Sequence, residues 1–392
     1  MSSSEKFHRG KTAIVGIGAT EFSKDSGRSE LQLACEAVRA ALKDAGLAPA
    51  DVEGLVTFMA DTSPEIDIAR NLGIPGLKFF SRTPYGGGGT CATIALASMA
   101  VNAGLADVVV CYRAFNERSG HRLGQPVQPQ PGQQAIAMSW YTSFGLFTPA
   151  GFVAMAARRY MHEYGATSED FGRISVASRK HAANNPNAFF YGKPITLEEH
   201  QASRWIVEPL HLLDCCQESD GGVAVVVTSA ERARDLPQKP AYITGAAQGA
   251  APLQEAMTSY SRPSIAGLYE MQVVGQQLWA QSGLRPEDID SAVLYDHFTP
   301  FVLMQLEDLG FCKRGEAPDF IRNGAIEIGG RLPINTHGGQ LGEAYIHGMN
   351  GVTEGVRQIR GQSVNQVADC RNVLVTAGTG VPTSGIVLQA EV

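Results

Sequence analysis

Apolar positions recur with a helical period and then in a continuous run, and this succession occurs twice along the chain. Residues 37–58, AVRAALKDAGLAPADVEGLVTF, predict an amphipathic helix, a turn containing Gly-Leu, a Pro and acidic residues, and an apolar strand. Residues 274–298, VGQQLWAQSGLRPEDIDSAVLYDHF, predict the same parts in the same order. With Gly46 aligned on Gly283, Val56 falls on Val293, so the two copies share one register.

Further apolar segments frame each copy. Short β-rich segments precede them at 12–22 and 241–250. A small-residue helix and an apolar strand follow, at 98–112 and again in EGVRQIRG with the strand at 371–378. Helices that alternate with near-continuous apolar strands are typical of parallel sheets covered by helices on both faces. The pattern therefore predicts a duplicated, layered α/β protein.

The halves predicted by this duplication differ in length. We assign residues 1–235 to the first and 236–392 to the second. The stretch from about 120 to 235 elaborates the first half, with a helix in GFVAMAARRYMHEYG and a loop in NNPNAFFYGKP.

Composition and charge narrow the classes of function. With 392 residues, 44% of them hydrophobic and 18% charged, the chain resembles a soluble globular protein with a large core. The net charge is -7 without a long Lys or Arg run, which argues against nucleic-acid binding. The N-terminal stretch has no apolar signal core and no segment approaches a membrane span, so we expect a cytoplasmic protein.

The cysteines lack the spacing of a metal site. Seven are present, at positions 35, 91, 111, 215, 216, 312 and 370. We interpret them as buried thiols in a reducing compartment and expect no metal.

A glycine-rich stretch, YGGGGT at 85–90, precedes a helix that we expect to begin near Cys91. Amides at such a position could bind an anion. A flexible turn explains the same residues equally well, and the spacing fits neither a dinucleotide fingerprint nor a Walker loop. The sequence leaves both interpretations open.

Several segments resemble the sterol-carrier-type thiolases. They are residues 181–229 (HAANNPNAFFYGKP to VVVTS), the DGG turn at 220–222 and the NTHGG loop at 335–339. The resemblance extends over nearly the whole chain. It implies the thiolase fold, an α/β architecture of two βαβαβαββ halves in five layers (α-β-α-β-α). It also implies a homodimer and acyl-CoA substrates, with coenzyme A part of the substrate and no other cofactor.

The resemblance locates four catalytic motifs, from each of which this sequence departs. In the first, the nucleophilic cysteine of thiolases is replaced by Gly87, which we assign to a substrate-binding loop. Cys91 lies one helical turn further on, and we interpret it as a buried helix residue. In the fourth, Ala377 replaces a second reactive cysteine, and Gly378 and Gly380 are left as backbone donors to the substrate.

The second motif holds the thioester oxygen in thiolases and begins there with Asn or His. Here it reads Tyr295-Asp296-His297-Phe298. We expect Asp296 to fix the geometry of the loop. His297 is predicted to support or pack against the site rather than to catalyse.

The third motif, Asn-x-x-Gly-Gly followed by Gly-His-Pro, supplies the catalytic histidine of thiolases. Alignment on Asn335 matches Gly338 and Gly339, which we expect to line an oxyanion or substrate-binding loop. It places Tyr345 on the histidine. His347 nearby is predicted to bind a backbone carbonyl and to support the site.

Two tyrosines in place of cysteine and histidine indicate proton transfer without a covalent intermediate. Retro-aldol cleavage of a β-hydroxyacyl-CoA fits that inventory, with backbone amides holding the enolate. Because a free phenol has a pKa near 10, we expect loop amides or a cationic His297 or His347 to favour the phenolate.

The tyrosine pattern is similar to the thiolase-like lipid-transfer-protein aldolases of bacterial steroid degradation. That resemblance implies cleavage of a steroid acyl-CoA with a tertiary ring hydroxyl into an androstenedione-type ketosteroid and propionyl-CoA. Tyr345 would act as base on the hydroxyl and Tyr295 as acid toward the enolate. It also implies a partner, the small OB-fold domain of an associated acyl-CoA hydratase.

Other interpretations remain open at this stage. The chain could be a non-catalytic acyl-CoA or lipid carrier, or a residual thiolase that uses Cys91. Each tyrosine also fits a half-buried packing residue. Four aromatic residues could line a sterol pocket or form a core beneath a loop: Trp140, Tyr141, Phe144 and Phe147.

Overall fold

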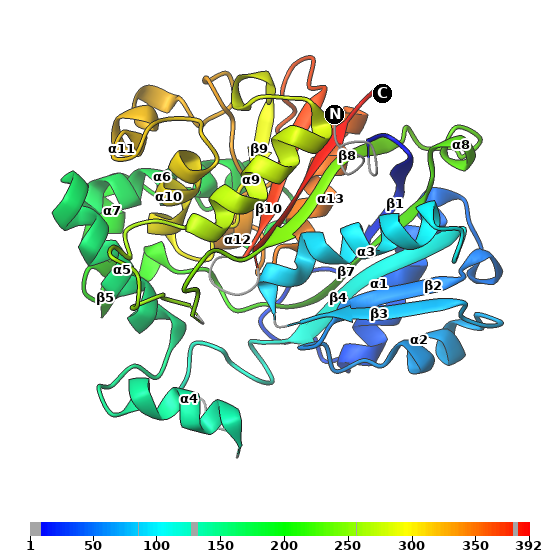
Figure 1. Ribbon diagram of the computed structural model, residues 1–392, viewed down its shortest axis with the longest axis horizontal. Coiled ribbons are helices and arrows are strands. Elements are labelled where there is room, and N and C mark those ends of the chain that lie inside the picture. The colour runs from blue at the N-terminus through cyan, green and yellow to red at the C-terminus, as the bar shows by residue number, and fades with distance from the viewer. Residues whose placement is uncertain (1–8, 85, 127–131, 256, 379–382) are drawn as a thin grey trace.

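A computed structural model describes residues 9–84, 86–126, 132–255, 257–378 and 383–392 (Figure 1). Strands and helices alternate in the first part of the chain, in the order β1 (Thr12–Ala19), α1 (Glu30–Ala45), β2 (Gly54–Phe58), α2 (Glu65–Leu72), β3 (Phe79–Thr83), α3 (Thr90–Asn102), β4 (Val108–Asn116) and, much later, β7 (Asp220–Ser229).

The segment between β4 and β7 is mainly helical, as predicted, and contains α4 (Gln133–Thr142), α5 (Pro149–Tyr164), α6 (Ser168–Asn184), α7 (Leu197–Ala202), β5 (Trp205–Val207) and β6 (Leu210–His211). The predicted helix and loop of this segment are confirmed in α5 and in the turns after α6. The short α8 (Ala230–Ala233) follows β7. The boundary predicted between the two halves, after residue 235, lies between α8 and β8 and stays a prediction.

The remaining elements repeat the first pattern with added helices: β8 (Ala241–Gly249), α9 (Tyr269–Ser282), β9 (Ser291–Val293), α10 (Thr299–Asp308), α11 (Ala317–Phe320), α12 (Gly339–Gly342), α13 (Met349–Arg360), β10 (Asn372–Ala377) and β11 (Thr383–Gln389). The repeat seen in the sequence is confirmed: α1 and α9 both end at a left-handed glycine, Gly46 (φ 68°) and Gly283 (φ 70°).

Nine of the strands form one mixed sheet in the order β3-β2-β4-β7-β1-β8-β11-β10-β9, and β5 and β6 pair separately. Corresponding strands follow in the same order on either side of the central β1–β8 pair. This pair joins Thr12 to Ile243 and Ile14 to Ala241. A fifth strand on the second side is reduced to a single bridge between Ala292 and Ile334. The two related strand sets therefore meet edge to edge.

Helices fill the space between the strand sets and cover them outside (Figure 1). Helix α3 packs against β2, β4 and β7 and also against β8 and β11, while α13 contacts β9, β10 and β11 as well as β1 and β7. Helix α1 covers the far side of β1, β4 and β7, and α9 that of β8 and β11. This succession is the predicted five-layer arrangement, and most residues of α3 are buried because it lies in the middle layer.

Candidate active site

Tyr295 stands immediately beyond β9, where its backbone is held on both sides. Its N–H donates to Thr376 Oγ1 on β10 (3.0 Å), and its carbonyl accepts from Gln305 Nε2 on α10 (2.8 Å). Thr376 Oγ1 in turn donates to Gln305 Oε1 (2.7 Å), which closes the triangle. All three groups are buried, so these bonds fix the direction in which the Tyr295 ring points.

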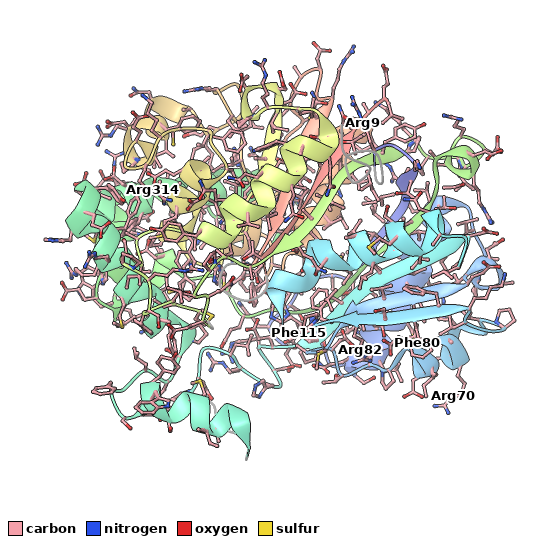
Figure 2. All side chains as sticks on the ribbon, viewed as in Figure 1. Arg9, Arg70, Phe80, Arg82, Phe115 and Arg314 are labelled. Carbon is pink, nitrogen blue, oxygen red and sulfur yellow. The ribbon has the colours of Figure 1, made fainter. Side chains whose placement is uncertain are left out.

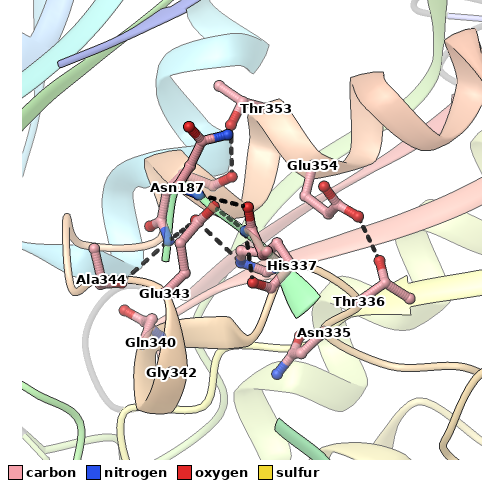
Figure 3. Close-up of polar contacts among 12 residues, drawn as sticks. Asn187, Asn335, Thr336, His337, Gln340, Gly342, Glu343, Ala344, Thr353 and Glu354 are labelled. Carbon is pink, nitrogen blue, oxygen red and sulfur yellow. Dashed lines mark hydrogen bonds and ion pairs between the residues drawn. The ribbon is translucent and has the colours of Figure 1, made fainter. Parts of the chain in front are cut away.

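Tyr345 lies in the loop between α12 and α13. Figure 3 shows polar contacts around Glu343 and Ala344, the two residues that precede it. The Tyr345 N–H donates to Ser219 Oγ (3.2 Å). Just before it, Glu343 accepts from Asn350 Nδ2 (2.9 Å) and from Asn185 Nδ2 (3.0 Å), and Asn350 also donates to the carbonyl of Ala344 (3.1 Å). The loop therefore carries Tyr345 on a rigid support.

The structure brings the two predicted tyrosines together. Their hydroxyl oxygens are 3.2 Å apart and share a hydrogen bond. Tyr295 is 4% exposed and Tyr345 7%. Burial raises the pKa of both phenols above the ordinary value, strongly so for Tyr345, whose pKa the neighbouring Tyr295 raises further. Both side chains are therefore neutral in the resting site.

Neither histidine of the site is cationic, so this part of the sequence interpretation was wrong. Burial lowers the pKa of His297 to about 3. Burial and then the charge of Arg113 lower the pKa of His347 well below its ordinary range. His347 also does not bind a carbonyl through Nδ1, because that atom accepts a hydrogen bond from Arg113 Nε (3.1 Å).

Arg113 is a site residue that the sequence interpretation missed. It is 2% exposed, its NH1 bonds Asp61 Oδ2 (3.0 Å), and its guanidinium lies over the Phe115 ring (4.1 Å to the centroid). Phe115, labelled in Figure 2, stacks on His347 with 4.9 Å between the centroids. Because a guanidinium only donates, Arg113 fixes the His347 proton on Nε2. A single Arg within the apolar strand VVVCYRAF was the available sequence signal.

Gly87 gives the site its shape by having no side chain. A Cβ on this residue would lie 1.8 Å from the Tyr295 hydroxyl, so the phenol occupies the space of a side chain at position 87. The surrounding glycines form a 3-10 turn, Gly87–Gly89, whose Gly88 carbonyl accepts from Ser384 Oγ (2.6 Å). The turn is thus tied to β11, and anion binding there stays a prediction.

Cys91 is buried in α3, as the sequence predicted. Its thiol lies 3.6 Å from the Val375 carbonyl, and burial raises its pKa, which keeps the sulfur protonated and unreactive. All seven cysteines are free. The prediction that all are buried was wrong, because four are half-buried: Cys35, Cys215, Cys216 and Cys312.

Asp296 and the loop glycines pack against one another. Asp296 Oδ1 accepts from the Gln340 N–H (2.8 Å), and a Cβ on Gly339 would lie 2.0 Å from Oδ2. A Cβ on Gly338 would lie 2.6 Å from that of Ala182. Burial raises the pKa of Asp296 to about 6. These contacts make Asp296 and the glycine pair a tightly packed support for the loop.

The other two predicted glycines lie after β10. Gly378 follows the strand with a left-handed φ of 69°. Gly380 is outside the described residues. The role of both as backbone donors stays a prediction.

A cavity of about 430 Å³ opens beside the tyrosine pair. Its lining includes Tyr345, His297, Cys216 and Glu117. Five cationic side chains also line it: Lys24, Arg118, Arg122, Arg179 and Arg204. Tyr295 is not among the described residues that line the cavity; it is hydrogen-bonded to Tyr345, which is.

The aromatic group at 140–147 neither lines this cavity nor forms a core. Helix α4 projects from the layered body (Figure 1), and Trp140 is 75%, Phe144 82% and Phe147 47% exposed. Tyr141 alone is packed, with its hydroxyl donating to Glu255 Oε2 (2.9 Å). The interpretation of the group as a core beneath a loop was therefore wrong, and its role in a sterol pocket stays a prediction.

Comparison with known proteins identifies the family. Residues 252–388 match the family described as Thiolase C-terminal domain-like. The chain is 70% identical, over 97% of its length and 98% of the relative's, to a steroid side-chain-cleaving aldolase of Thermomonospora curvata. The chain belongs to the steroid side-chain-cleaving aldolase family. It is also 68% identical to the 17-hydroxy-3-oxo-4-pregnene-20-carboxyl-CoA lyase of Mycobacterium tuberculosis, over 97% of this chain and 99% of that one.

A solved Ltp2-ChsH2(DUF35) aldolase superposes with a TM-score of 0.95 at 69% identity, covering 98% of this chain and 99% of that one. The predicted resemblance, the thiolase fold and the aldolase class of enzyme are thus confirmed for this member of the family. Within the described part of the chain, no helix is long and apolar enough to cross a membrane.

Proposed function

We propose that this aldolase cleaves a steroid β-hydroxyacyl-CoA by a retro-aldol reaction, giving a ketosteroid and propionyl-CoA. The observation that carries the proposal is the hydrogen-bonded pair Tyr295–Tyr345, at 3.2 Å, in a site whose nucleophile position is Gly87. The names of the relatives, which describe side-chain cleavage of steroids and lysis of a pregnene carboxyl-CoA, support the substrate class.

The pair is suited to a proton relay. Retro-aldol cleavage moves one proton from the hydroxyl oxygen to the α-carbon, so no net proton is taken up. As the carbon–carbon bond breaks, the steroid hydroxyl gives its proton to the Tyr345 oxygen, and its carbon becomes the ketone. Tyr345 passes its own proton to Tyr295, which protonates the α-carbon of the enolate. Since the phenols exchange protons in concert, neither needs to be ionised beforehand.

The positions of the two tyrosines support Tyr345 as the base and Tyr295 as the acid. Tyr345 lines the cavity and Tyr295 lies behind it, so the incoming hydroxyl meets Tyr345 first. Tyr295 stands beside Gly87, where the acyl group of a thiolase substrate would be attacked. The cations along the cavity suit the phosphates of coenzyme A.

We further propose that the protein works as a homodimer with a small OB-fold domain of an acyl-CoA hydratase. The solved aldolase of the comparison is named as an assembly of Ltp2 with ChsH2(DUF35), which supports a partner domain.

A cleavage assay tests the proposal. The protein, alone and with the OB-fold partner, is incubated with a steroid 17-hydroxyacyl-CoA, and ketosteroid and propionyl-CoA are followed by mass spectrometry. Both products should accumulate together, and Cys91→Ala should cleave at the wild-type rate. Binding with the substrate left intact in both incubations would overturn the proposal in favour of a carrier. Loss of activity in Cys91→Ala, with acylation of that thiol in the wild type, would indicate a residual thiolase.

A further inference from the structure

A buried carboxyl group that the relay does not use lies in the same cavity. Glu117 directly follows β4 and is 2% exposed. It lines the cavity together with Tyr345 and His297. Because Glu117 is buried in the wall of the cavity, its charge state matters to any bound thioester.

No cation neutralises this carboxyl group directly. Its Oε2 has no hydrogen-bond partner among the described residues. Lys24 Nζ instead donates to Gln217 Oε1 (3.1 Å) and to the Glu218 carbonyl (2.5 Å). Arg113 is engaged by Asp61 and His347. An unpaired carboxylate at such a depth is costly, whereas a carboxylic acid is not.

The charged and titratable groups around Glu117 reinforce this conclusion. Burial, followed by the negative charge of Glu218, raises its pKa to about 9. Arg113 and Lys24 act in the opposite direction without cancelling the effect. The other titratable groups that interact with it are uncharged at neutral pH: Cys216, Tyr295 and Tyr345.

We propose that the carboxylic acid of Glu117 donates a hydrogen bond to the thioester oxygen of the bound acyl-CoA, on which negative charge develops as the carbon–carbon bond breaks. This inference rests on the proposed retro-aldol reaction. The tyrosines are occupied with the proton that moves from oxygen to carbon, so a separate donor is needed for the enolate oxygen. A buried acid supplies one in a water-excluded site, where such donors are most effective.

The kinetic test compares Glu117→Gln, which keeps a neutral donor, with Glu117→Leu, which has none. Glu231→Gln is the matched control, because Glu231 on α8 is exposed. In Glu117→Leu, kcat should fall about 10²- to 10³-fold with little change in KM, because the donor acts mainly in the transition state. Glu117→Gln should remain within about tenfold of the wild type and should lack the loss of activity that wild type shows as pH rises through about 9. Wild-type kcat in a folded Glu117→Leu would overturn the proposal.

An infrared measurement separates failure of this inference from failure of the proposed function, because it needs no turnover. Wild-type protein at neutral pH should show the carbonyl band of a buried carboxylic acid that is missing in Glu117→Gln. The band should shift when propionyl-CoA is added. A wild-type band that is absent, or that propionyl-CoA leaves unchanged, would overturn the proposal whether or not the steroid thioester is cleaved.

Discussion

At the scale of single residues, the site depends on one glycine as much as on the two tyrosines. The Tyr295 phenol fills the space that a side chain at position 87 would occupy. A cysteine nucleophile at position 87 and the acid Tyr295 therefore exclude each other sterically. Because His297 and His347 are neutral, neither supplies an imidazolium that would stabilise a phenolate. This favours proton transfer through the hydrogen bond between the phenols.

Gly87→Ala tests this steric account. Its Cβ would displace the Tyr295 hydroxyl, so we expect cleavage to fall about 10²-fold or more, as for loss of a positioned acid. Gly76→Ala is the matched control, because an added Cβ there meets nothing within 4 Å. Unchanged steady-state kinetics of Gly87→Ala would contradict the account.

At the scale of elements, the buried Arg113 links three segments of the chain. Arg113 lies in β4, and its side chain donates hydrogen bonds to Asp61, which follows β2, and to His347 in the loop before α13. It thereby connects the strand that leads to Glu117 with the loop that carries Tyr345. Arg113 is therefore one of the side chains that join the first strand set to the loop of the site.

Arg113→Met should reveal how much that link stabilises the protein. It leaves Asp61 as a buried carboxylate without its cation, so we expect a loss of about 3–5 kcal/mol in the free energy of unfolding. Arg158→Met breaks the exposed pair with Glu208 and should cost less than about 1 kcal/mol. Urea unfolding of both variants measures the difference, and equal losses would show that Arg113 is not a structural link.

At the scale of the whole molecule, the duplication could be predicted because its signals are local. Helix periodicity, the caps Gly46 and Gly283 and the apolar strands repeat within short windows. The tyrosines could be located only through motif register. Their contact could not be predicted from spacing, since it depends on how β9 packs against the loop before α13.

The failures of sequence interpretation have equally physical causes. Trp140 and Phe144 were expected to be buried because they are large and aromatic. They are exposed because α4 projects from the layered part of the protein. The charge of His347 was misjudged because burial beside Arg113 is a property of the folded chain. Arg113 and Glu117 were overlooked although each is a charged residue within or directly after an apolar strand.

The pH dependence of folding follows from the same burial. Glu117 has a folded pKa of about 9, above its unfolded value near 4.3, so between these values the folded state binds more protons. The Glu117 contribution to stability is therefore present below about pH 4 and is lost as pH rises toward 9. Glu117→Gln should melt at a higher temperature than wild type at pH 8, and the two melting temperatures should converge toward pH 4. A constant difference across this range would contradict a buried acid.

The central claim is that Tyr295 and Tyr345 act as one relay, and kcat for steroid thioester cleavage by Tyr295→Phe, Tyr345→Phe and the double variant tests it most directly. Each single variant should lose about 10²- to 10⁴-fold. The double variant should fall little below the slower single variant, because groups that act as a unit are not additive. Wild-type kcat in either single variant, or a double loss equal to the product of the two single losses, would contradict the relay.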